Sequence, residues 1–274
     1  YAPVVQWATI RFFITLAIIS KWHTKQLDFV LAYTQADIER DLYMKLPAGF
    51  TVPGRTISEQ DRRDYVLKLE KNLYGQKQAG RVWYLHLKKN LLKLGFKPSQ
   101  HDECVFYYGK TIFIVYTDDT ILLGPDKEEI DQLVEKLGKT FKIEDQGNLS
   151  DYLGIKIERK PDGTLEWTQP TLTQSILKDL KLDGEEIKGK QNKPNIKSVP
   201  ANTSVPLTDH RESPDHNPKD FEYRHVIGKL LYLEKSTRPD ISCAVHQCAR
   251  HCANPKIQLT AAVKRIGRYL LGTK

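Results

Sequence analysis

Hydrophobic positions in this chain recur at helical spacing in several segments. Near the N-terminus they fall at Trp7, Ile10, Ile14, Ala17 and Ile18, which predicts an amphipathic helix. The same spacing, with capping residues at the start or glycine at the end, predicts three further helices. They run from Leu73 to about Leu94, from Asp126 to Gly138, and from Thr171 onward.

Other apolar runs are short and rich in β-branched residues, which is typical of strands. Thr111–Tyr116 and Thr120–Leu123 flank the tripeptide Thr117-Asp118-Asp119, so we predict a tight hairpin. Further strands are predicted at Lys25–Tyr33, at Tyr65–Leu69, and at Tyr152–Glu158 with Thr164–Gln169 around Asp162-Gly163. Hairpins rather than βαβ repeats indicate an α+β fold, an antiparallel sheet with helices on one face.

The pattern changes near residue 188. Residues 188–220 are rich in proline, asparagine, serine, lysine and aspartate and contain few core residues, which is typical of a linker or long loop. Apolar stripes at helical spacing resume after it. We therefore expect three parts, which are residues 1–187, 188–220 and a helical segment at 221–274.

Composition narrows the class of protein. Of 274 residues, 40% are hydrophobic and 28% are charged, and 42 Lys and Arg outnumber 34 Asp and Glu. The resulting net charge of +8 favours a polyanionic partner. Four cysteines do not make a secreted disulfide framework, so we expect an intracellular protein. Phe12–Ile19 is too short for a membrane span, and the start at Tyr1 suggests a piece of a longer chain.

Three acids occupy unusual positions. Asp118 and Asp119 lie at the predicted hairpin turn, and Asp28 lies within a predicted buried strand. Each has an ordinary interpretation, because aspartate is common in turns and at exposed strand edges. Together, they would place like charges at one end of an antiparallel sheet, an arrangement that divalent cations favour. Two-metal phosphoryl transfer requires such a set, and Mg²⁺ is the usual ion.

Two other clusters allow more than one interpretation. Lys77, Arg81, Lys88, Lys89 and Lys93 lie on or near the helix predicted from Leu73, where they form either a phosphate-binding surface or a solvated basic face. His246, Cys248, His251 and Cys252 have zinc-like spacing. The two cysteines also lie on an apolar stripe, which favours a core role.

The motifs resemble a known family. Tyr116-Thr117-Asp118-Asp119 resembles the Y-x-D-D box of reverse transcriptases. Other segments resemble, in order, the Ty1/copia class of LTR retrotransposons: Tyr1-Ala2-Pro3-Val4-Val5, Gln26-Leu27-Asp28, Leu42-Tyr43-Met44, Leu73-Tyr74-Gly75, Lys77-Gln78-Ala79, Arg81 with Trp83, Tyr152-Leu153-Gly154-Ile155 and Arg238-Pro239-Asp240-Ile241. The chain departs from the family pattern at Gly80, Gln76, Gln35-Ala36 and Thr117, and it keeps all three acids.

The resemblance implies a right-hand polymerase with a palm, partial fingers and a thumb-like helical end. It implies RNA-directed DNA synthesis with two Mg²⁺ ions, for which Mn²⁺ could substitute. The partners would be an RNA template, a DNA primer, dNTP and the rest of a Pol polyprotein with integrase and RNase H, in a cytoplasmic particle or the nucleus, without a membrane.

The resemblance also assigns roles to residues. Asp28, Asp118 and Asp119 would be catalytic, with the Phe29 carbonyl as a further metal contact. Tyr33 would exclude a ribose 2′-hydroxyl, and Lys77 and Gln78 would line the nucleotide. The nucleic acid would contact Arg81, Lys88, Lys89, Tyr152 and Gly154. Two alternatives are a decayed copy that binds nucleic acid without catalysis and another palm-type nucleotidyl transferase such as a cyclase.

Overall fold

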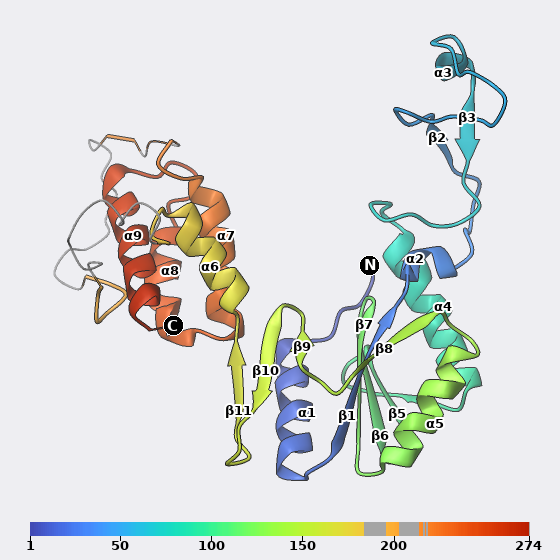
Figure 1. Ribbon diagram of the computed structural model, residues 1–274, viewed down its shortest axis with the longest axis horizontal. Helices are drawn as coiled ribbons and strands as arrows, with labels where there is room; N and C mark the ends of the chain where they lie inside the picture. The colour runs from blue at the N-terminus through green and yellow to red at the C-terminus, as the bar shows by residue number, and fades with distance from the viewer. Residues whose placement is uncertain (184–195, 203–213, 216, 218, 274) are drawn as a thin grey trace. The chain divides into compact units, whose positions relative to one another are not determined.

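The computed structural model describes residues 1–183, 196–202, 214–215, 217 and 219–273 of the chain (Figure 1). The chain divides into two compact units, Tyr1–Leu149 and Ser150–Lys274. This boundary differs from the one predicted after residue 187. The reason is that α6 (Pro170–Asp179) packs against α7 (Tyr223–Ser236) and α9 (Ile257–Gly272). Most of the linker predicted at 188–220 lies outside the described residues.

The first unit is built on a six-stranded sheet in which every neighbouring pair is antiparallel. Its spatial order is β4 (Lys97–Pro98), β5 (Val105–Tyr108), β6 (Thr111–Tyr116), β7 (Asp119–Gly124), β1 (His23–Phe29) and β8 (Ile143–Gly147). The predicted hairpin is confirmed as β6 and β7, and β7 also pairs with β1. Strands far apart in sequence therefore meet at the centre of the sheet.

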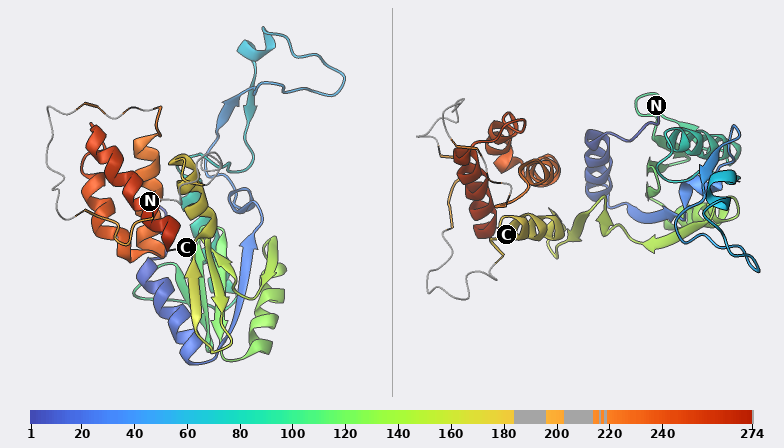
Figure 2. Two further views of the ribbon diagram at one scale, coloured as in Figure 1. Left: turned by 60° about the vertical axis from the view of Figure 1, so that its left-hand side comes forward. Right: turned by 90° about the horizontal axis from the view of Figure 1, so that it is seen from above.

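Helices cover both faces of this sheet, whereas the sequence pattern predicted one covered face. Figures 1 and 2 show α1 (Trp7–Ile19) on one side, with α4 (Ala79–Lys93) and α5 (Lys127–Gly138) on the other. Residues 111–115 and 120–124 are all buried, which requires cover on both faces because successive side chains alternate between them. The unit is thus an α+β structure with an antiparallel sheet packed on helices.

The predicted helical stripes are confirmed in these three helices. α1 buries Ile10, Ile14 and Ala17. α4 buries the predicted stripe of Trp83, Leu87 and Leu91. At the start of α5, the Asp126 carboxylate accepts hydrogen bonds from the backbone N–H groups of the second and third helical residues, as an N-cap does.

Two element boundaries differ from the prediction, and both lie near the three acids. The predicted strand Lys25–Tyr33 ends at Phe29, because Leu31 adopts a left-handed conformation with φ of 52° and starts the short helix α2 (Ala32–Gln35). The helix predicted from Leu73 begins only at Ala79, because Gly75 has φ of 94° and forms a turn. Tyr33 is therefore helical and does not lie in a strand.

Residues 37–72 include a small two-stranded ribbon. β2 (Tyr43–Lys45) pairs with β3 (Val66–Lys68), and α3 (Asp61–Asp64) lies in the connection between them. One ribbon face carries the register pairs Tyr43 with Lys68 and Lys45 with Val66, and all four side chains are exposed. This ribbon does not join the six-stranded sheet.

The second unit combines a three-stranded sheet with helices around their own apolar core. Its elements are β9 (Asp151–Tyr152), β10 (Ile155–Arg159), β11 (Leu165–Thr168), α6, α7, the 3-10 helix η2 (Pro239–Ile241), α8 (Ser242–Ala249) and α9. The strand predicted from Tyr152 is interrupted, because Leu153 and Gly154 both have positive φ and turn the chain between β9 and β10. The helix predicted from Thr171 begins one residue earlier, at Pro170.

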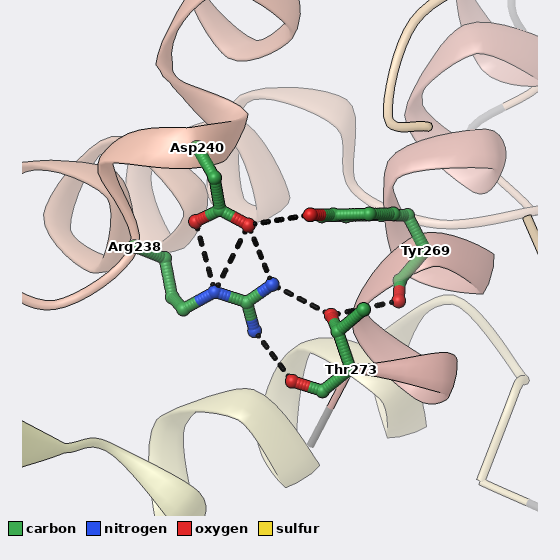
Figure 3. Close-up of polar contacts among 4 residues, drawn as sticks. All are labelled: Arg238, Asp240, Tyr269 and Thr273. Carbon is green, nitrogen blue, oxygen red and sulfur yellow. Dashed lines mark hydrogen bonds and ion pairs between the residues drawn. The ribbon is translucent and has the colours of Figure 1, made fainter. Parts of the chain in front are cut away.

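A polar network of Arg238, Asp240, Tyr269 and Thr273 lies at the C-terminal end of α9, as Figure 3 shows. The Arg238 guanidinium donates hydrogen bonds from Nε and Nη2 to the Asp240 carboxylate, the shortest at 2.8 Å. It also donates from Nη2 to the Thr273 hydroxyl at 2.6 Å and from Nη1 to the Thr273 carbonyl at 3.1 Å. The Tyr269 hydroxyl donates to the same Asp240 carboxylate at 2.8 Å. The network thus ties the last turn of α9 to the segment before α8. None of the described helices has both the length and the apolar composition needed to cross a bilayer.

Candidate active site

The three acids meet at one end of the first unit's sheet. Asp28 and Asp119 are register partners across the antiparallel pair of β1 and β7, so their side chains leave the sheet on the same face. Asp118 lies in the β6–β7 turn, and its carbonyl accepts a hydrogen bond from the Phe29 N–H at 3.2 Å. The structure thus brings the backbone positions of the three acids together at one end of the sheet, whereas the expected sharing of a metal ion by their carboxylates stays a prediction (Figure 1 shows the end of β1 beside this turn).

The turn itself has an unusual backbone. Thr117 has φ of 60°, a conformation that β-branched residues rarely adopt. The Trp83 indole N–H of α4 donates a 2.7 Å hydrogen bond to the Thr117 carbonyl. The Trp83 ring in turn packs edge-on against Phe29, with ring centroids 5.1 Å apart. The core of the unit thus holds the turn that carries Asp118.

Burial and neighbouring negative charge raise the pKa values of Asp28 and Asp119. Burial, followed by the charges of Asp118 and Asp28, raises the pKa of Asp119 to about 6. Burial, followed by the charges of Asp118 and Glu144, raises the pKa of Asp28. None of the three forms an ion pair with a described lysine or arginine. Unneutralised carboxylates at a strand end have the donor chemistry that Mg²⁺ prefers.

The side chains are neighbours without forming a finished coordination shell. Within the described part of the chain, no group of three or more histidine, cysteine, aspartate or glutamate side chains is arranged to hold a metal ion. The donor set nevertheless fits a divalent cation in its chemistry, because carboxylate oxygens are the ligands that Mg²⁺ takes in proteins.

Tyr33 lies beside this set, on α2. Burial and then the charge of Asp118 raise the pKa of the Tyr33 phenol. Its ring packs against that of Tyr74, with centroids 4.4 Å apart. Tyr33 is half-buried.

The basic residues of the α4 region differ in their surroundings. Lys77, Arg81 and Lys89 are exposed, whereas Lys88 is half-buried with its ammonium 5.7 Å from the centroid of the Tyr84 ring. Gln78 occupies the N-cap position of α4 and donates a hydrogen bond to Gln76 at 3.3 Å. These positions allow contact with a phosphate backbone from the exposed side of α4.

The remaining predicted residues lie in the second unit. Tyr152 is buried, with 1% of its surface exposed, so its side chain cannot form part of a nucleic-acid surface as predicted. Gly154, in the turn between β9 and β10, is exposed. Cys248 of the zinc-like cluster is buried in the core of this unit, in agreement with the core interpretation.

Two residues near the acids were not predicted. Glu144 on β8 is the register partner of Asp28, and its charge contributes to the raised pKa of that carboxyl. Tyr74 contacts Tyr33 and lies within electrostatic reach of Asp118. Tyr74 belongs to a recognised motif, Leu73-Tyr74-Gly75, but nothing in the local pattern around Glu144 indicates its pairing with Asp28.

Comparisons with known proteins give a matching family and several relatives. The pattern of the family described as "Reverse transcriptase (RNA-dependent DNA polymerase)" matches residues 1–191. Over its whole length, the chain is 34% identical to the retrovirus-related Pol polyprotein from transposon RE2 of Arabidopsis thaliana. It is 32% identical to the polyprotein from transposon TNT 1-94 of Nicotiana tabacum. Over 95% of the chain, it is 24% identical to the transposon Ty1-BL Gag-Pol polyprotein of Saccharomyces cerevisiae. The chain spans 18%, 20% and 15% of these relatives, respectively.

Proposed function

The chain belongs to the reverse transcriptase family of Ty1/copia-type retrotransposons, and from this premise we propose that it extends a DNA primer on an RNA template. The observation that carries the proposal is the register of Asp28 with Asp119 beside the turn that holds Asp118. This places three carboxylates at one sheet end, with the pKa values of Asp28 and Asp119 raised by burial and like charge.

In this proposal, Asp28 and Asp118 are the main ligands for two Mg²⁺ ions, for which Mn²⁺ substitutes. Asp119 lies beside them, and the Phe29 carbonyl is an additional contact. When bound, the ions supply activation of the primer 3′-oxygen and charge stabilisation at the leaving pyrophosphate. The protein holds the carboxylates in place through the β1–β7 register and through the hydrogen bond from Trp83 to the turn.

The neighbouring residues select and orient the substrates. The Tyr33 ring occupies the space that a ribose 2′-hydroxyl would need, which favours dNTP. Lys77 and Gln78 line the nucleotide from the start of α4, and the exposed cations Arg81 and Lys89 contact the nucleic-acid backbone, with Lys88 next to them. The backbone turn at Gly154 contacts the primer.

The parts of a right-hand polymerase can be assigned to the described elements on the same premise. The six-stranded sheet with its helices corresponds to the palm, because it carries the three acids. The β2–β3 ribbon corresponds to part of the fingers, and the helices of the second unit correspond to a thumb. In this proposal, the chain acts inside the cell together with the integrase and RNase H parts of a Pol polyprotein.

Primer extension tests the function directly. The purified chain, supplied with Mg²⁺, dNTP and a DNA primer on an RNA template, is expected to lengthen the primer. Asp118→Asn combined with Asp119→Asn should abolish extension, because it removes two of the three charges at the sheet end. A matched control, Asp64→Asn combined with Asp131→Asn, changes one exposed and one half-buried acid away from the site and should retain extension.

Two results would argue against the proposal. Extension that survives the double change at the sheet end would show that these carboxylates do not carry the chemistry. Salt-sensitive binding to duplex without any extension by the unmodified chain would instead support the alternative of a non-catalytic nucleic-acid-binding copy.

A further inference from the structure

The proposed sugar-selecting residue, Tyr33, lies on a helix that cannot hold it in place alone. α2 has four residues, and Leu31 enters it in a left-handed conformation. One helical turn is unstable in isolation, because nucleation fixes several dihedral angles for a single hydrogen bond. A steric selection between ribose and deoxyribose depends on a ring held in one position. Another segment must therefore support Tyr33.

Residues 71–74 provide this support. Lys71 forms an ion pair and a backbone bridge with Asp37, just after α2. The Asn72 side chain is fully buried, and its Nδ2 donates hydrogen bonds of 3.2 Å to the carbonyls of Ala36 and Asp37. These contacts fasten the 71–74 segment along the C-terminal end of α2.

Tyr74 completes this contact at the Tyr33 ring. The two ring centroids lie 4.4 Å apart with an interplanar angle of 31°. Tyr74 is at the second position of the turn Leu73–Gln76, in which the Gln76 N–H donates to the Leu73 carbonyl at 3.3 Å. Gly75 at the third position has φ of 94°, which favours glycine there. The turn thus presents the Tyr74 ring toward Tyr33.

The Tyr33 hydroxyl end has a second neighbour. A Cβ atom placed on Gly80 of α4 would lie 3.6 Å from the Tyr33 Oη, so this end of the ring adjoins the α4 backbone. Tyr74 still exposes 51% of its surface, which shows that it is not retained as a core residue. Its ring packs on the Tyr33 ring, and its hydroxyl forms a hydrogen bond with the backbone of Ala32, the first residue of α2.

From these contacts, we infer that Tyr74 is a positioning residue that holds the Tyr33 ring and thereby sets the preference for deoxyribose over ribose. The inference rests on the proposed function, because it concerns substrate selection at the same site. It assigns Tyr74 no direct part in the chemical step.

Selection between dNTP and rNTP tests this inference. Tyr74→Ala should reduce the ratio of kcat/KM for dNTP over rNTP by about 3- to 10-fold, the size expected for loss of one aromatic pair. The change should appear mainly as a lower KM for rNTP, with kcat for dNTP nearly unchanged. Tyr74→Phe keeps the ring and should retain the preference. Tyr43→Ala removes a tyrosine of similar exposure, 57%, outside this contact and serves as the matched control.

A second measurement keeps the inference separate from the proposed function. Nuclear magnetic resonance spectra of the full chain with ¹³C-labelled tyrosine rings report on the Tyr33 ring, whose signals are assigned by their loss in Tyr33→Phe. Tyr74→Ala should shift these signals, whereas Tyr43→Ala should leave them unchanged. An unchanged dNTP preference in Tyr74→Ala, while Tyr33→Val admits rNTP, would overturn the inference alone. Absence of any primer extension by the unmodified chain would overturn the proposed function, whereas unshifted Tyr33 signals would refute the support by Tyr74.

Discussion

Asp119 shows how a single residue at the sheet end is set apart from an ordinary surface acid. It is half-buried, it faces Asp28 across the strand pair, and it follows Asp118 directly. Burial is the largest cause of its raised pKa, and the two neighbouring charges add to it. A raised pKa means that the folded state opposes ionisation of this carboxyl, which a bound cation would reverse.

The stability of the metal-free chain should therefore depend on pH through this group. Between pH 3.8 and about 6 the folded state binds more protons at Asp119 than the unfolded state does, so the free energy of unfolding should fall as pH rises through this window. Asp119→Asn removes the charge and should be more stable than the unmodified chain at pH 7, with a difference that shrinks toward pH 4. Urea unfolding with a chelator across this range measures it, and a difference independent of pH would contradict it.

At the scale of elements, the β6–β7 hairpin combines a regular ladder with a strained turn. Its strands pair from Ile112 with Leu123 to Tyr116 with Asp119, which leaves two residues, Thr117 and Asp118, to reverse the chain. Two-residue hairpins with positive φ at the first position favour glycine there. Threonine at φ of 60° instead stores strain, which the ladder and the Trp83 hydrogen bond hold in place.

Relieving this strain should stabilise the hairpin. Thr117→Gly should raise the free energy of unfolding by about 0.5 to 1 kcal/mol, because the relief of a left-handed β-branched residue exceeds the added entropy of an unfolded glycine. Thr117→Val keeps the β-branch and should leave stability nearly unchanged. Denaturant unfolding of the three chains measures the effect, and a Thr117→Gly chain no more stable than Thr117→Val would show that the turn is unstrained.

At the scale of the whole molecule, the chain contains two units with separate cores. The network around Arg238 belongs entirely to the second unit. It joins the segment after α7 to the last turn of α9 through the Asp240 carboxylate and the Thr273 carbonyl (Figure 3). A cation near a helix C-terminus also interacts favourably with the negative end of the helix dipole.

Loss of this network should therefore destabilise the second unit selectively. Arg238→Ala should weaken the packing of α9 by about 1 to 2 kcal/mol, because it removes several charge-assisted hydrogen bonds at a partly exposed site. Hydrogen exchange should accelerate in α9 and remain unchanged in β6 and β7. Arg250→Ala, which removes an exposed arginine with one 3.3 Å contact to Gln247, is the matched control. Equal acceleration in both units would contradict the prediction.

The local pattern of hydrophobic and polar residues determined many of the helices and strands of this protein. Helical spacing predicted α1, α4 and α5, and the two apolar runs predicted the β6–β7 hairpin, because short-range periodicity depends on which face of an element meets the core. The three acids were also identified from sequence, since aspartates in or beside apolar strands are uncommon.

Tertiary structure alone decided how these elements combine. The register of Asp28 with Asp119, the pairing of Glu144 with Asp28, and the contact of Tyr74 with Tyr33 all join segments that are distant in sequence. Such contacts depend on long-range packing, which leaves no periodicity in a local window. The burial of Tyr152 and the unit boundary after Leu149 are likewise properties of the folded chain that no local pattern indicates.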